Sequence, residues 1–437
     1  MKVLKFGGTS VGSAKRIKEV ARLITERGKN IVVLSAMSGT TNTLVEISDY
    51  LYKKNIAGAK ETINQLQAKY DAVIEELFEN DLFKQRAKEA LAENFEFIRS
   101  RDKEIFTLFE EREILAQGEL MSTALMALYL EEQGVNVKML PALDFMRTDK
   151  NAEPDTDYIG SKLTALIEKV GDADLYLTQG YICRNAYGEI DNLQRGGSDY
   201  TASLIGAAMN VDEIQIWTDI DGMHNNDPRF VEGTRPVHKL HFEEAAELAY
   251  FGAKILHPTC VLPAKLNNIP VRLLNTMQPE AEGTLICNAA TEGGIKAVAA
   301  KDNITAIKIK SGRMLLAYGF LRKVFEIFEN HRTSIDMIVT SEVGVSVTVD
   351  NERNLQAILD DLRKFGTVTV DRDMVIICVV GNLEWKNCGF EAEVVNALRD
   401  IPVRMISYGG SNYNISLLIK KEDKVRALRL LSEYIFK

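Results

Sequence analysis

The residues best suited to chemistry lie in four short stretches that combine glycine, hydroxyl groups and charge. They are KFGGTSVG at residues 5–12, SAMSGTTN at 35–42, QRGGSDYTASL at 194–204 and WTDIDGMHNNDPR at 217–229. Glycine-rich turns present free backbone N–H groups, which can hold an anion when a lysine or arginine lies beside them. Cations, hydroxyls and a few carboxylates without an activated nucleophile indicate phosphoryl transfer, where catalysis is mostly positioning and charge neutralisation.

In the first stretch, Lys5 ends an apolar strand and is followed by Gly7, Gly8 and Gly12. Such a cluster indicates that the main chain bends tightly or approaches another group closely. The glycine spacing is not that of a dinucleotide fingerprint, and no G-K-[ST] sequence closes a P-loop. A tight turn without a ligand is the alternative interpretation. SAMSGTTN follows the second strand, and it is either a further set of anion-binding groups or a loop that caps a helix.

In the third stretch, Arg195 stands before two glycines, and Ser198 and Asp199 begin a predicted helix of small residues. An arginine held on a glycine turn at a helix N-terminus suits a carboxylate or a phosphate, because its guanidinium group can donate two parallel hydrogen bonds. Serine or aspartate alone at this position would be a routine N-cap. The arginine therefore makes this stretch more specific than the other three.

The fourth stretch ends a strand with Thr218 and Asp219 and continues as a polar turn to Arg229. It resembles a calcium loop superficially, but the required order of carboxylates is broken and no spaced glutamate follows. A loop that contacts a nucleotide is the favoured functional interpretation. A polar turn capped by an aspartate is the alternative.

Two further charged residues are candidates for the same site. In AQGELMSTAL, Glu119 is predicted at the start of a helix, where a carboxylate is favourable without any ligand. In GAKILHP, Lys254 either reaches the pocket or is a solvated surface lysine, and His257 is interpreted as structural. The five cysteines are scattered and lack a C-x-x-C pair, so neither a disulfide framework nor a protein-built metal site is expected.

The composition limits the class of protein. A chain of 437 residues with 46% apolar and 26% charged residues is typical of a globular protein with two or three domains. The net charge of −9 and the lack of a basic block argue against a nucleic-acid partner. No stretch approaches the roughly 18 apolar residues of a membrane span, and the strand at residue 2 is expected to leave no room for a signal peptide. A cytoplasmic location without a membrane partner is therefore expected.

Strands and helices alternate from residue 1 to about 285. Apolar runs such as VLKF, IVVLS and EIQIWTDI predict strands, and the helical stretches between them predict an α/β fold with a mainly parallel sheet covered on both faces. Residues 42–133 are predicted to form successive helices with breaks near Gly58, Asp81 and Gly118. Because ligands bind beyond the carboxyl ends of parallel strands, Lys5 stands where a ligand is expected.

A polar stretch at 283–295 marks the predicted boundary between a first domain at 1–285 and a second at 296–437. The second domain repeats itself, because SIDMIVTSEVGVSVTVD and IPVRMISYGGSNYNISLLIK have the same pattern and each lies between two predicted helices. Two βαββαβ units are therefore predicted at about 311–372 and 373–437, with the strand 296–310 completing the second. Such units serve either packing and dimerisation or ligand sensing at an interface.

Taken in order, KFGGTSVG, SAMSGTTN, the GE at 118–119, RGGSDYTA, WTDIDG…DPR and GAKILHP resemble the aspartate kinase family over essentially the whole chain. The resemblance implies an amino-acid-kinase (carbamate-kinase-like) α/β sandwich followed by two ferredoxin-like ACT domains, which are βαββαβ regulatory units. It implies that MgATP phosphorylates the β-carboxylate of L-aspartate to 4-phospho-L-aspartate, the first step toward lysine, threonine and methionine. It also implies a homo-oligomer formed through the ACT domains, with Mg²⁺ held largely by the phosphates of ATP.

The resemblance assigns roles to individual residues. Lys5 would contact the transferring phosphoryl group, and Asp199 would organise the substrate end of the site. L-Aspartate would be held by Thr41, Glu119, Arg195 and Ser198, with Arg195 on the α-carboxylate and Glu119 near the α-ammonium. ATP would be contacted by Lys5, Gly7, Gly8, Thr218, Asp219, His224, Arg229 and Lys254. Two residues depart from the family pattern, since Gln194 stands where glycine is usual and His224 where a tyrosine is common.

The first ACT unit resembles that of the lysine-inhibited members of the family. The resemblance implies that lysine binds at an ACT–ACT dimer interface, with Asp336 at its amino group. The implied lining residues are Met314, Gly319, Phe320, Leu321, Ser334 and Asp336, with Ser341, Glu342 and Val343 across the interface. Threonine, alone or together with lysine, is the alternative effector.

Two other functions stay open at this point. One is a different acyl-phosphate-forming amino-acid kinase of the same fold, against which the tandem ACT units and the RGGSD stretch weigh. The other is a non-catalytic amino-acid sensor built on a kinase scaffold. The presence of Lys5, Arg195 and Asp199 weighs against such a sensor.

Overall fold

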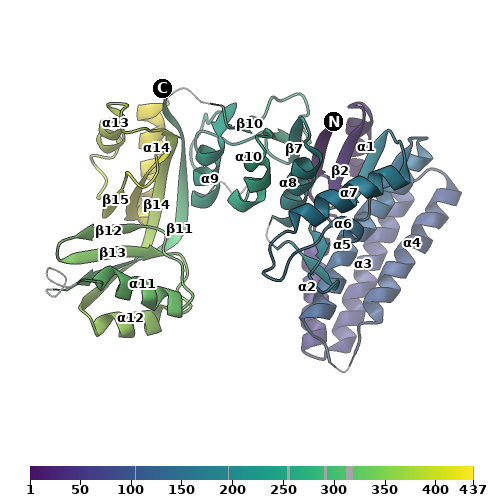
Figure 1. Ribbon diagram of the computed structural model, residues 1–437, viewed down its shortest axis with the longest axis horizontal. Helices are drawn as coiled ribbons and strands as arrows, with labels where there is room; N and C mark the ends of the chain where they lie inside the picture. Colours follow the sequence, from purple (N-terminus) through teal and green to yellow (C-terminus); the bar gives the residue numbers. More distant parts are fainter. Residues whose placement is uncertain (104, 195, 253–255, 290–292, 312–317, 437) are drawn as a thin grey trace. The chain divides into compact units, whose positions relative to one another are not determined.

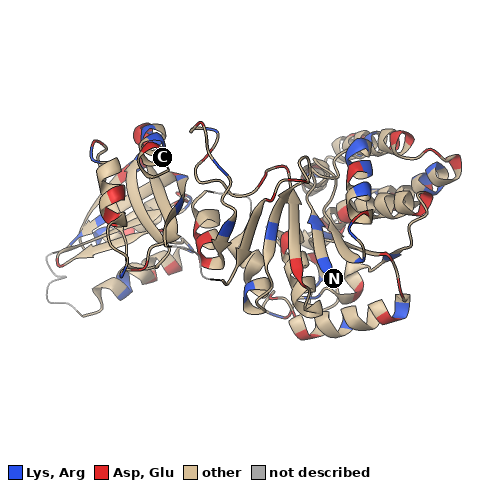
Figure 2. Cartoon of the chain, turned by 90° about the horizontal axis from the view of Figure 1, so that it is seen from above, with Lys and Arg blue, Asp and Glu red and all other residues tan. Residues whose placement is uncertain are grey.

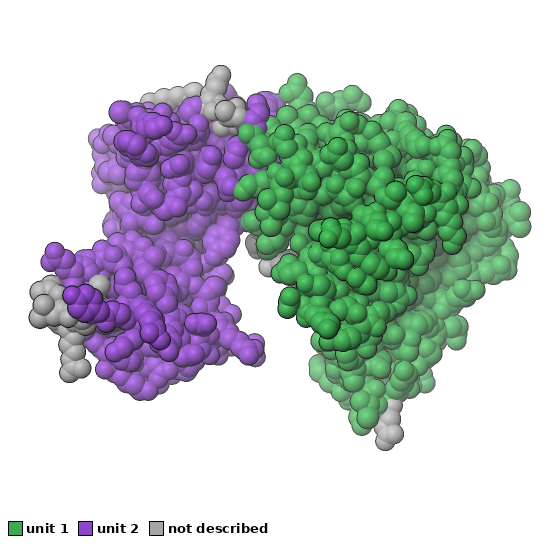
Figure 3. All heavy atoms as spheres, viewed as in Figure 1, with its two compact units in different colours: residues 1–222, 256–288 green, residues 223–255, 289–437 purple. Residues whose placement is uncertain are grey.

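The computed structural model describes residues 1–103, 105–194, 196–252, 256–289, 293–311 and 318–436. These residues form two compact units (Figure 3). Unit 1 comprises residues 1–222 and 256–288, and unit 2 comprises residues 223–255 and 289–437. The compact units therefore differ from a simple division at residue 285, because the segment 223–255 packs with the later part of the chain.

The core of unit 1 is a mainly parallel β-sheet (Figure 1). Within this unit its strands lie in the order β3-β4-β2-β1-β7-β9-β10, with β10 antiparallel to β9 and the other neighbours parallel. Strands β2 and β4 are buried along their whole length, as expected when helices cover both faces of a sheet. The predicted α/β fold class is confirmed. The strands of unit 1 are β1 (Lys2–Phe6), β2 (Asn30–Leu34), β3 (Val137–Met139), β4 (Leu175–Gln179), β7 (Glu213–Thr218), β9 (Val271–Asn275) and β10 (Thr284–Cys287), and β5 (Ile182–Arg184) pairs with β6 (Ile190–Asn192) in a separate antiparallel hairpin.

The helices of unit 1 have the apolar faces that the sequence pattern predicts. Helix α1 is capped by Ser13 and buries Ile17, Val20 and Ile24. The helices are α1 (Ala14–Thr25), α2 (Thr40–Tyr52), α3 (Ile56–Leu77), α4 (Asp81–Arg99), α5 (Leu108–Glu132), α6 (Ala142–Phe145), α7 (Thr156–Val170), α8 (Gly197–Met209) and α10 (Leu262–Leu266), with a 3₁₀ turn at Pro258–Val261. The predicted breaks near Gly58 and Asp81 fall at the starts of α3 and α4.

The predicted helix break near Gly118 is wrong. Helix α5 runs without interruption from Leu108 to Glu132 and begins with a capping box formed by Thr107 and Glu110. A Cβ atom added at Gly118 would lie 2.8 Å from the Cβ of Ala36. The glycine therefore allows the helix to approach the loop after β2 closely, and its role is packing within a continuous helix.

Unit 2 contains an antiparallel sheet with the strand order β12-β13-β11-β14-β16-β15. The two central strands are long and are shared by two βαββαβ halves, each with its own buried core. The predicted pair of ACT units is confirmed, with the first part of β11 pairing in the second unit and its last part in the first. The elements are β8 (Lys239–His241), α9 (Phe242–Phe251), β11 (Gly294–Lys310), α11 (Phe320–Asn330), β12 (Ile338–Ser341), β13 (Gly344–Val349), α12 (Leu355–Arg363), β14 (Thr367–Asn382), α13 (Phe390–Ala397), β15 (Met405–Ser407), β16 (Asn414–Lys420), a 3₁₀ turn at Lys421–Asp423 and α14 (Lys424–Ile435).

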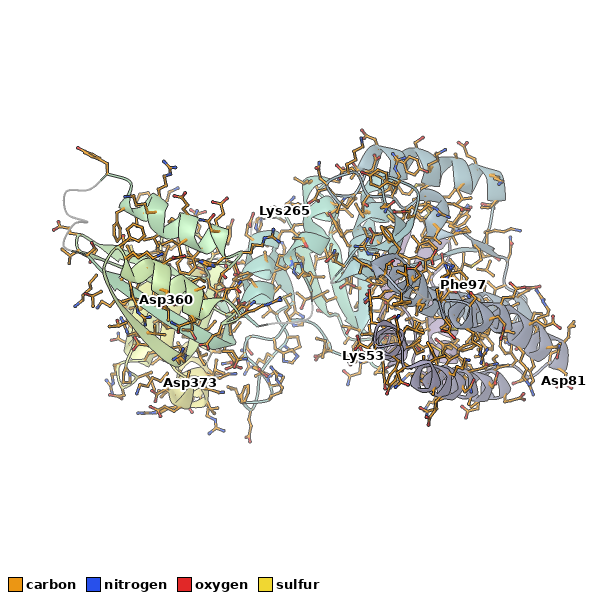
Figure 4. All side chains as sticks on the ribbon, turned by 90° about the horizontal axis from the view of Figure 1, so that it is seen from below. Lys53, Asp81, Phe97, Lys265, Asp360 and Asp373 are labelled. Atoms are coloured by element: carbon orange, nitrogen blue, oxygen red, sulfur yellow. The ribbon has the colours of Figure 1, made fainter. Side chains whose placement is uncertain are left out.

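Strands β11 and β14, which both ACT units share, bend at the point where the part belonging to one unit ends and the part belonging to the other begins. Asn303 in β11 has φ +61°, and Asp373 in β14, labelled in Figure 4, has φ +54°. The strand register shifts on either side of Ile304. Asparagine and aspartate tolerate the left-handed conformation better than most residues, so these two positions accommodate the bend at low cost.

Charged residues of both signs are interspersed along the helices (Figure 2). Among the described helices, none is both long enough and apolar enough to cross a membrane.

The core of the second ACT unit should be sensitive to loss of volume. Ile377 lies in β14, is fully buried and belongs to this core. We expect Ile377→Ala to lower the free energy of unfolding by about 2–5 kcal/mol, because the substitution removes buried methylene groups and leaves a cavity. Urea unfolding of the full chain followed by circular dichroism measures the loss. Val395→Ala, at an exposed position of α13, is the control and should change the value by less than about 0.5 kcal/mol.

Candidate active site

A cavity of about 720 Å³ opens at the carboxyl ends of β1 and β2, within unit 1. Loops that follow parallel strands meet at this edge of the sheet, which is where such folds bind ligands. The cavity is lined by Lys5, Gly8, Ser35, Ala36, Met37, Ser38, Gly39, Thr41, Asn42, Leu108, Glu111, Arg112, Leu115, Glu119, Tyr181, Asn192, Gln194, Gly196, Gly197, Ser198 and Asp199. Three of the four predicted stretches and Glu119 therefore meet at one cavity.

The glycines after β1 serve close approach between two loops. A Cβ atom at Gly8 would lie 2.8 Å from the carbonyl oxygen of Ala36, and one at Gly12 would lie 3.0 Å from the Cβ of Ser38. The backbone N–H of Ser38 donates to the carbonyl of Gly8 at 3.1 Å. Side chains at these glycines would push the loops apart. The glycine cluster therefore sets the distance between the first and second stretches.

Lys5 and Asp199 form a nearly buried ion pair. The Nζ of Lys5 lies 2.7 Å from Oδ1 of Asp199, and their side chains are only 12% and 11% exposed. Oδ1 is buried and accepts no hydrogen bond from the described residues, so the contact is described as an ion pair alone. Water screens this pair less than a surface pair. The positive charge of Lys5 is thus fixed at the carboxyl end of β1.

Helix α8 brings its first turn to the cavity. Its N-cap is Gly196, with φ +72°, and Ser198 receives a hydrogen bond from the hydroxyl of Ser35 at 3.0 Å. The turn is packed tightly, because a Cβ atom at Gly180 would lie 2.6 Å from the Cβ of Ser198, and one at Gly196 would lie 2.7 Å from Sγ of Cys260. The N-terminus of a helix favours anions, so the fold presents a positive potential at this side of the cavity.

Gln194 has φ +60°, in the left-handed region that glycine adopts without strain. The position is therefore one where glycine is conformationally favoured, and this chain carries glutamine there. Its N–H donates to the side chain of Asn192 at 3.2 Å, which supports the turn. The departure from the family pattern leaves the turn in place.

Glu119 lies in the middle of α5, and the prediction that it begins a helix is wrong. Its Oε1 accepts the backbone N–H of Ala36 at 3.2 Å, while its Oε2 is buried without a hydrogen-bond partner. Burial raises the pKa of Glu119 to about 8, although the bond from Ala36 opposes the shift. A carboxyl group in this state lacks a positive counter-charge among the described residues, and an ammonium group of a ligand could supply one.

The other predicted site residues fall into three groups. Thr41 lines the cavity, whereas Gly7, Thr218 and Asp219 lie at the ends of the neighbouring strands β1 and β7 without lining it. His224 and Arg229 belong to unit 2, where the His224 ring bonds the hydroxyl of Thr234 at 2.9 Å and Arg229 pairs with Asp227 at 2.6 Å. Arg195, Lys254 and Met314 lie outside the described residues.

The predicted effector residues lie around the start of α11 and the β12–β13 turn. Gly319 caps α11 with φ +82°, Phe320 is buried and Leu321 is exposed. Ser334 and Asp336 lie between α11 and β12, and Ser341, Glu342 and Val343 lie at the end of β12 and the turn that follows. The Asp336 side chain is fully buried and pairs with Lys301 at 2.7 Å.

Two supporting residues, Lys69 and Tyr70, were missed by the sequence analysis. Lys69 of α3 donates to the carbonyl of Ser38 at 2.7 Å, and the buried Tyr70 shares a hydrogen bond with Thr40 at 3.0 Å. These contacts tie the loop after β2 and the start of α2 to helix α3. A lysine and a tyrosine in an amphipathic helix carry no motif, so no sequence signal distinguished them from surface and core residues.

Among the described residues, no group of three or more histidine, cysteine, aspartate or glutamate side chains is placed to hold a metal ion. Of the carboxylates that line the cavity, Asp199 pairs with Lys5, Glu119 accepts the backbone N–H of Ala36 and Glu111 accepts the hydroxyl of Tyr52. The site therefore combines cations, N–H groups and carboxylates that each have a different partner.

Comparison with known proteins identifies the class to which this fold and site belong. Residues 1–275 match the amino acid kinase family, and residues 377–434 match an ACT domain. The lysine-sensitive aspartokinase 3 of Escherichia coli is 33% identical over 99% of both chains. The chain belongs to the aspartokinase family.

Solved structures agree with this assignment. E. coli aspartokinase III in complex with aspartate and ADP (R-state) has a TM-score of 0.84 at 32% identity, and both chains are covered completely. The same protein in complex with lysine and aspartate (T-state) has a TM-score of 0.81 at 33% identity, again over both complete chains.

The close contact between Gly180 and Ser198 yields a test of the cavity. We expect Gly180→Ala to lower kcat/KM of the aspartokinase reaction at least tenfold, because the added methyl group displaces the first turn of α8. Steady-state kinetics at saturating ATP measure the change. Gly160→Ala is the matched control, since a Cβ atom there meets its nearest neighbour only at 3.9 Å. Equal activity of both variants would contradict the role of this turn.

Proposed function

We propose that this chain transfers the γ-phosphoryl group of ATP to the β-carboxylate of L-aspartate, giving 4-phospho-L-aspartate and ADP. The single observation that carries the proposal is the cavity that brings together Lys5, Glu119, Ser198 and Asp199. The aspartate and ADP bound by the similar E. coli protein support the choice of substrates.

The reaction needs charge neutralisation more than acid–base chemistry. An aspartate side chain has a pKa of about 3.9, so it is already ionised at neutral pH and requires no general base. A carboxylate oxygen forms a bond to the γ-phosphorus, while the bond to the oxygen that bridges to the β-phosphate breaks and ADP keeps the electron pair. Lys5 neutralises the charge that gathers on the transferring group, and Asp199 holds Lys5 in place.

The chain's own residues orient the substrate. Glu119 binds the α-ammonium group, Arg195 binds the α-carboxylate, and the hydroxyls of Thr41 and Ser198 complete the site. The buried and unpartnered Oε2 of Glu119 supports the first of these roles. Carried over from the family, the ATP-binding residues would be Lys5, Gly7, Gly8, Thr218, Asp219, His224, Arg229 and Lys254.

Mg²⁺ would accompany ATP and lower the charge of its phosphates. The donor set fits an ion held through the nucleotide, because no group of three or more metal-binding side chains occurs among the described residues. The residues nearest the transferring group then supply N–H donors and the charge of Lys5.

The regulatory part of the proposal concerns unit 2. The ACT units would form a homo-oligomer and bind L-lysine as a feedback inhibitor, through the residues around Gly319, Asp336 and Ser341. The lysine-bound state of the similar E. coli protein supports lysine as the effector. Threonine is the second candidate. We place the enzyme in the cytoplasm.

Trapping the acyl phosphate with hydroxylamine tests the reaction directly. We expect hydroxamate that depends on L-aspartate and ATP, and a loss of about 100- to 1,000-fold in kcat for Lys5→Met, because the substitution removes the charge that faces the transferring group. Lys15→Met, at a side chain that is 84% exposed, is the control. Hydroxamate formed from L-glutamate but not L-aspartate would indicate another kinase of this fold, and lysine binding without turnover would indicate a sensor.

The raised pKa of Glu119 predicts a pH dependence of substrate binding. Below its pKa of about 8 the free carboxyl group is protonated, so binding an ammonium group there requires loss of the proton. We expect the KM for L-aspartate to fall as the pH rises from 6 to 8, by up to about tenfold per pH unit, and then to level off.

Two variants test whether Glu119, rather than another carboxylate of the cavity, causes the pH dependence of the KM. Glu119→Gln should raise the KM at pH 8 and abolish most of its pH dependence, because the amide cannot ionise. Glu111→Gln, at a carboxylate that also lines the cavity, should keep the wild-type slope. A Glu119→Gln enzyme with an unchanged slope would refute the assignment.

A further inference from the structure

A cluster in unit 2, centred on the buried side chain of Asp336, connects helix α9 with the first ACT unit. Oδ1 of Asp336 accepts a hydrogen bond from the hydroxyl of Tyr250 at 2.8 Å and another from Nζ of Lys301 at 2.7 Å. Tyr250 belongs to α9, Lys301 to β11, and Asp336 lies just before β12. One carboxylate oxygen therefore ties together three segments that are far apart in the sequence.

The surroundings of Lys301 are those of an amine-binding site. Its Nζ also lies 2.9 Å from Oδ2 of Asp350 and 4.3 Å from the centre of the Tyr250 ring. Two carboxylates and an aromatic face are a favourable environment for an ammonium ion. Burial alone would lower the pKa of Lys301, but Asp336 and Asp350 outweigh it and hold the pKa above its ordinary value. The chain thus places its own ammonium group against Asp336.

The second carboxylate oxygen of Asp336 accepts no hydrogen bond from the described residues. Oδ2 is buried without a hydrogen-bond partner, and the side chain as a whole has no exposed surface. A buried acceptor without a donor carries a desolvation cost that a donor from a ligand would remove. Burial raises the pKa of Asp336, whereas Lys301 and Tyr250 oppose this and favour the ionised form that an ammonium group requires.

We propose that Lys301 and Tyr250 are positioning residues, which hold Asp336 so that its Oδ2 accepts the ammonium group of an amino-acid effector, and that Tyr250 transmits the binding event to helix α9. An effector that adds positive charge at Oδ2 draws the carboxylate away from its bond to Tyr250. This inference rests on the regulatory part of the proposed function and adds to it the residues that join the effector to the rest of the chain.

Helix α9 is followed in the chain by residues that support the substrate turn. It ends at Phe251, and Leu256 follows five positions later. In unit 1, His257 and Cys260 pack against Gly196, where a Cβ atom would lie 3.2 Å from the Cβ of His257 and 2.7 Å from Sγ of Cys260. In sequence, α9 therefore directly precedes the residues that support the turn carrying Ser198. An effector inhibits through a movement of α9 only if it binds the displaced arrangement of α9 more tightly.

Tyr250→Phe separates binding from inhibition, because it removes the hydroxyl and keeps the ring beside Lys301. We expect the full-length variant to bind L-lysine, measured by calorimetry, within threefold of the wild-type affinity. Its maximal inhibition by L-lysine in the hydroxamate assay should fall to less than half of the wild-type value. Tyr434→Phe, at an exposed position of α14, is the control and should behave as wild type. Full inhibition of the Tyr250→Phe enzyme, or joint loss of binding and inhibition, overturns the role of Tyr250.

Lys301→Met tests the second positioning residue. The substitution leaves Asp336 without its counter-ion, so we expect the affinity for L-lysine to fall at least tenfold while the KM for L-aspartate stays within twofold. Lys301→Arg keeps the charge and should restore most of the affinity, whereas Lys310→Met, at an exposed position of the same strand, should have no effect. Unchanged or tighter binding by Lys301→Met would mean that Lys301 competes with the effector and overturns the proposal.

Two measurements on the wild-type enzyme distinguish a failure of this inference from a failure of the proposed reaction. Acyl phosphate formation reports the reaction, and calorimetric titration with L-lysine and with L-threonine reports the effector site. A wild-type chain that forms 4-phospho-L-aspartate but binds neither amino acid overturns the inference and leaves the proposed reaction standing.

Discussion

Electrostatic repulsion between two anions is the constraint on which unit 1 depends. A carboxylate and a polyphosphate repel each other, and the fold opposes this by collecting positive potential at one edge of a parallel sheet. Lys5 supplies a full charge, and the first turn of α8 supplies the partial charge of its free N–H groups. Asp199 keeps the lysine where it is needed. The sheet order places β1 at the centre of this arrangement, between β2 and β7.

Close packing of backbone against backbone makes the arrangement possible. Gly8 and Gly12 let the first loop touch the second, Gly118 lets helix α5 reach the same loop, and Gly180 leaves room for Ser198. Each glycine loses more conformational entropy on folding than another residue would, but it allows two backbone segments to lie close together. The same crowding excludes water from Glu119, which explains how a carboxyl group comes to be buried without a cation among the described residues. The loops of this active site are therefore preorganised largely by glycines, because a residue without a side chain permits close contact between backbone segments.

Much of this could be predicted from the sequence, and the failures have physical reasons. The strand alternation and the duplicated βαββαβ pattern were predictable, because periodicity and motif spacing report local structure directly. The meeting of Lys5, Glu119, Ser198 and Asp199 at one cavity was expected from the resemblance to the aspartate kinase family. Gly118 misled the prediction, since a glycine needed for packing looks the same as one that ends a helix. The packing of 223–255 with unit 2 depends on pairings between distant segments that no local pattern encodes, and Tyr250 and Asp336, for example, are 86 residues apart.

The continuous strands β11 and β14 have a consequence for how the regulatory region can change over evolutionary time. Because each strand belongs to both ACT units, neither unit can be deleted, exchanged or duplicated alone without cutting a central strand of the other. The pair must therefore be inherited as one indivisible module. Recombination between related genes would be tolerated only at its outer borders, and new effector specificity would have to arise by point substitution within it.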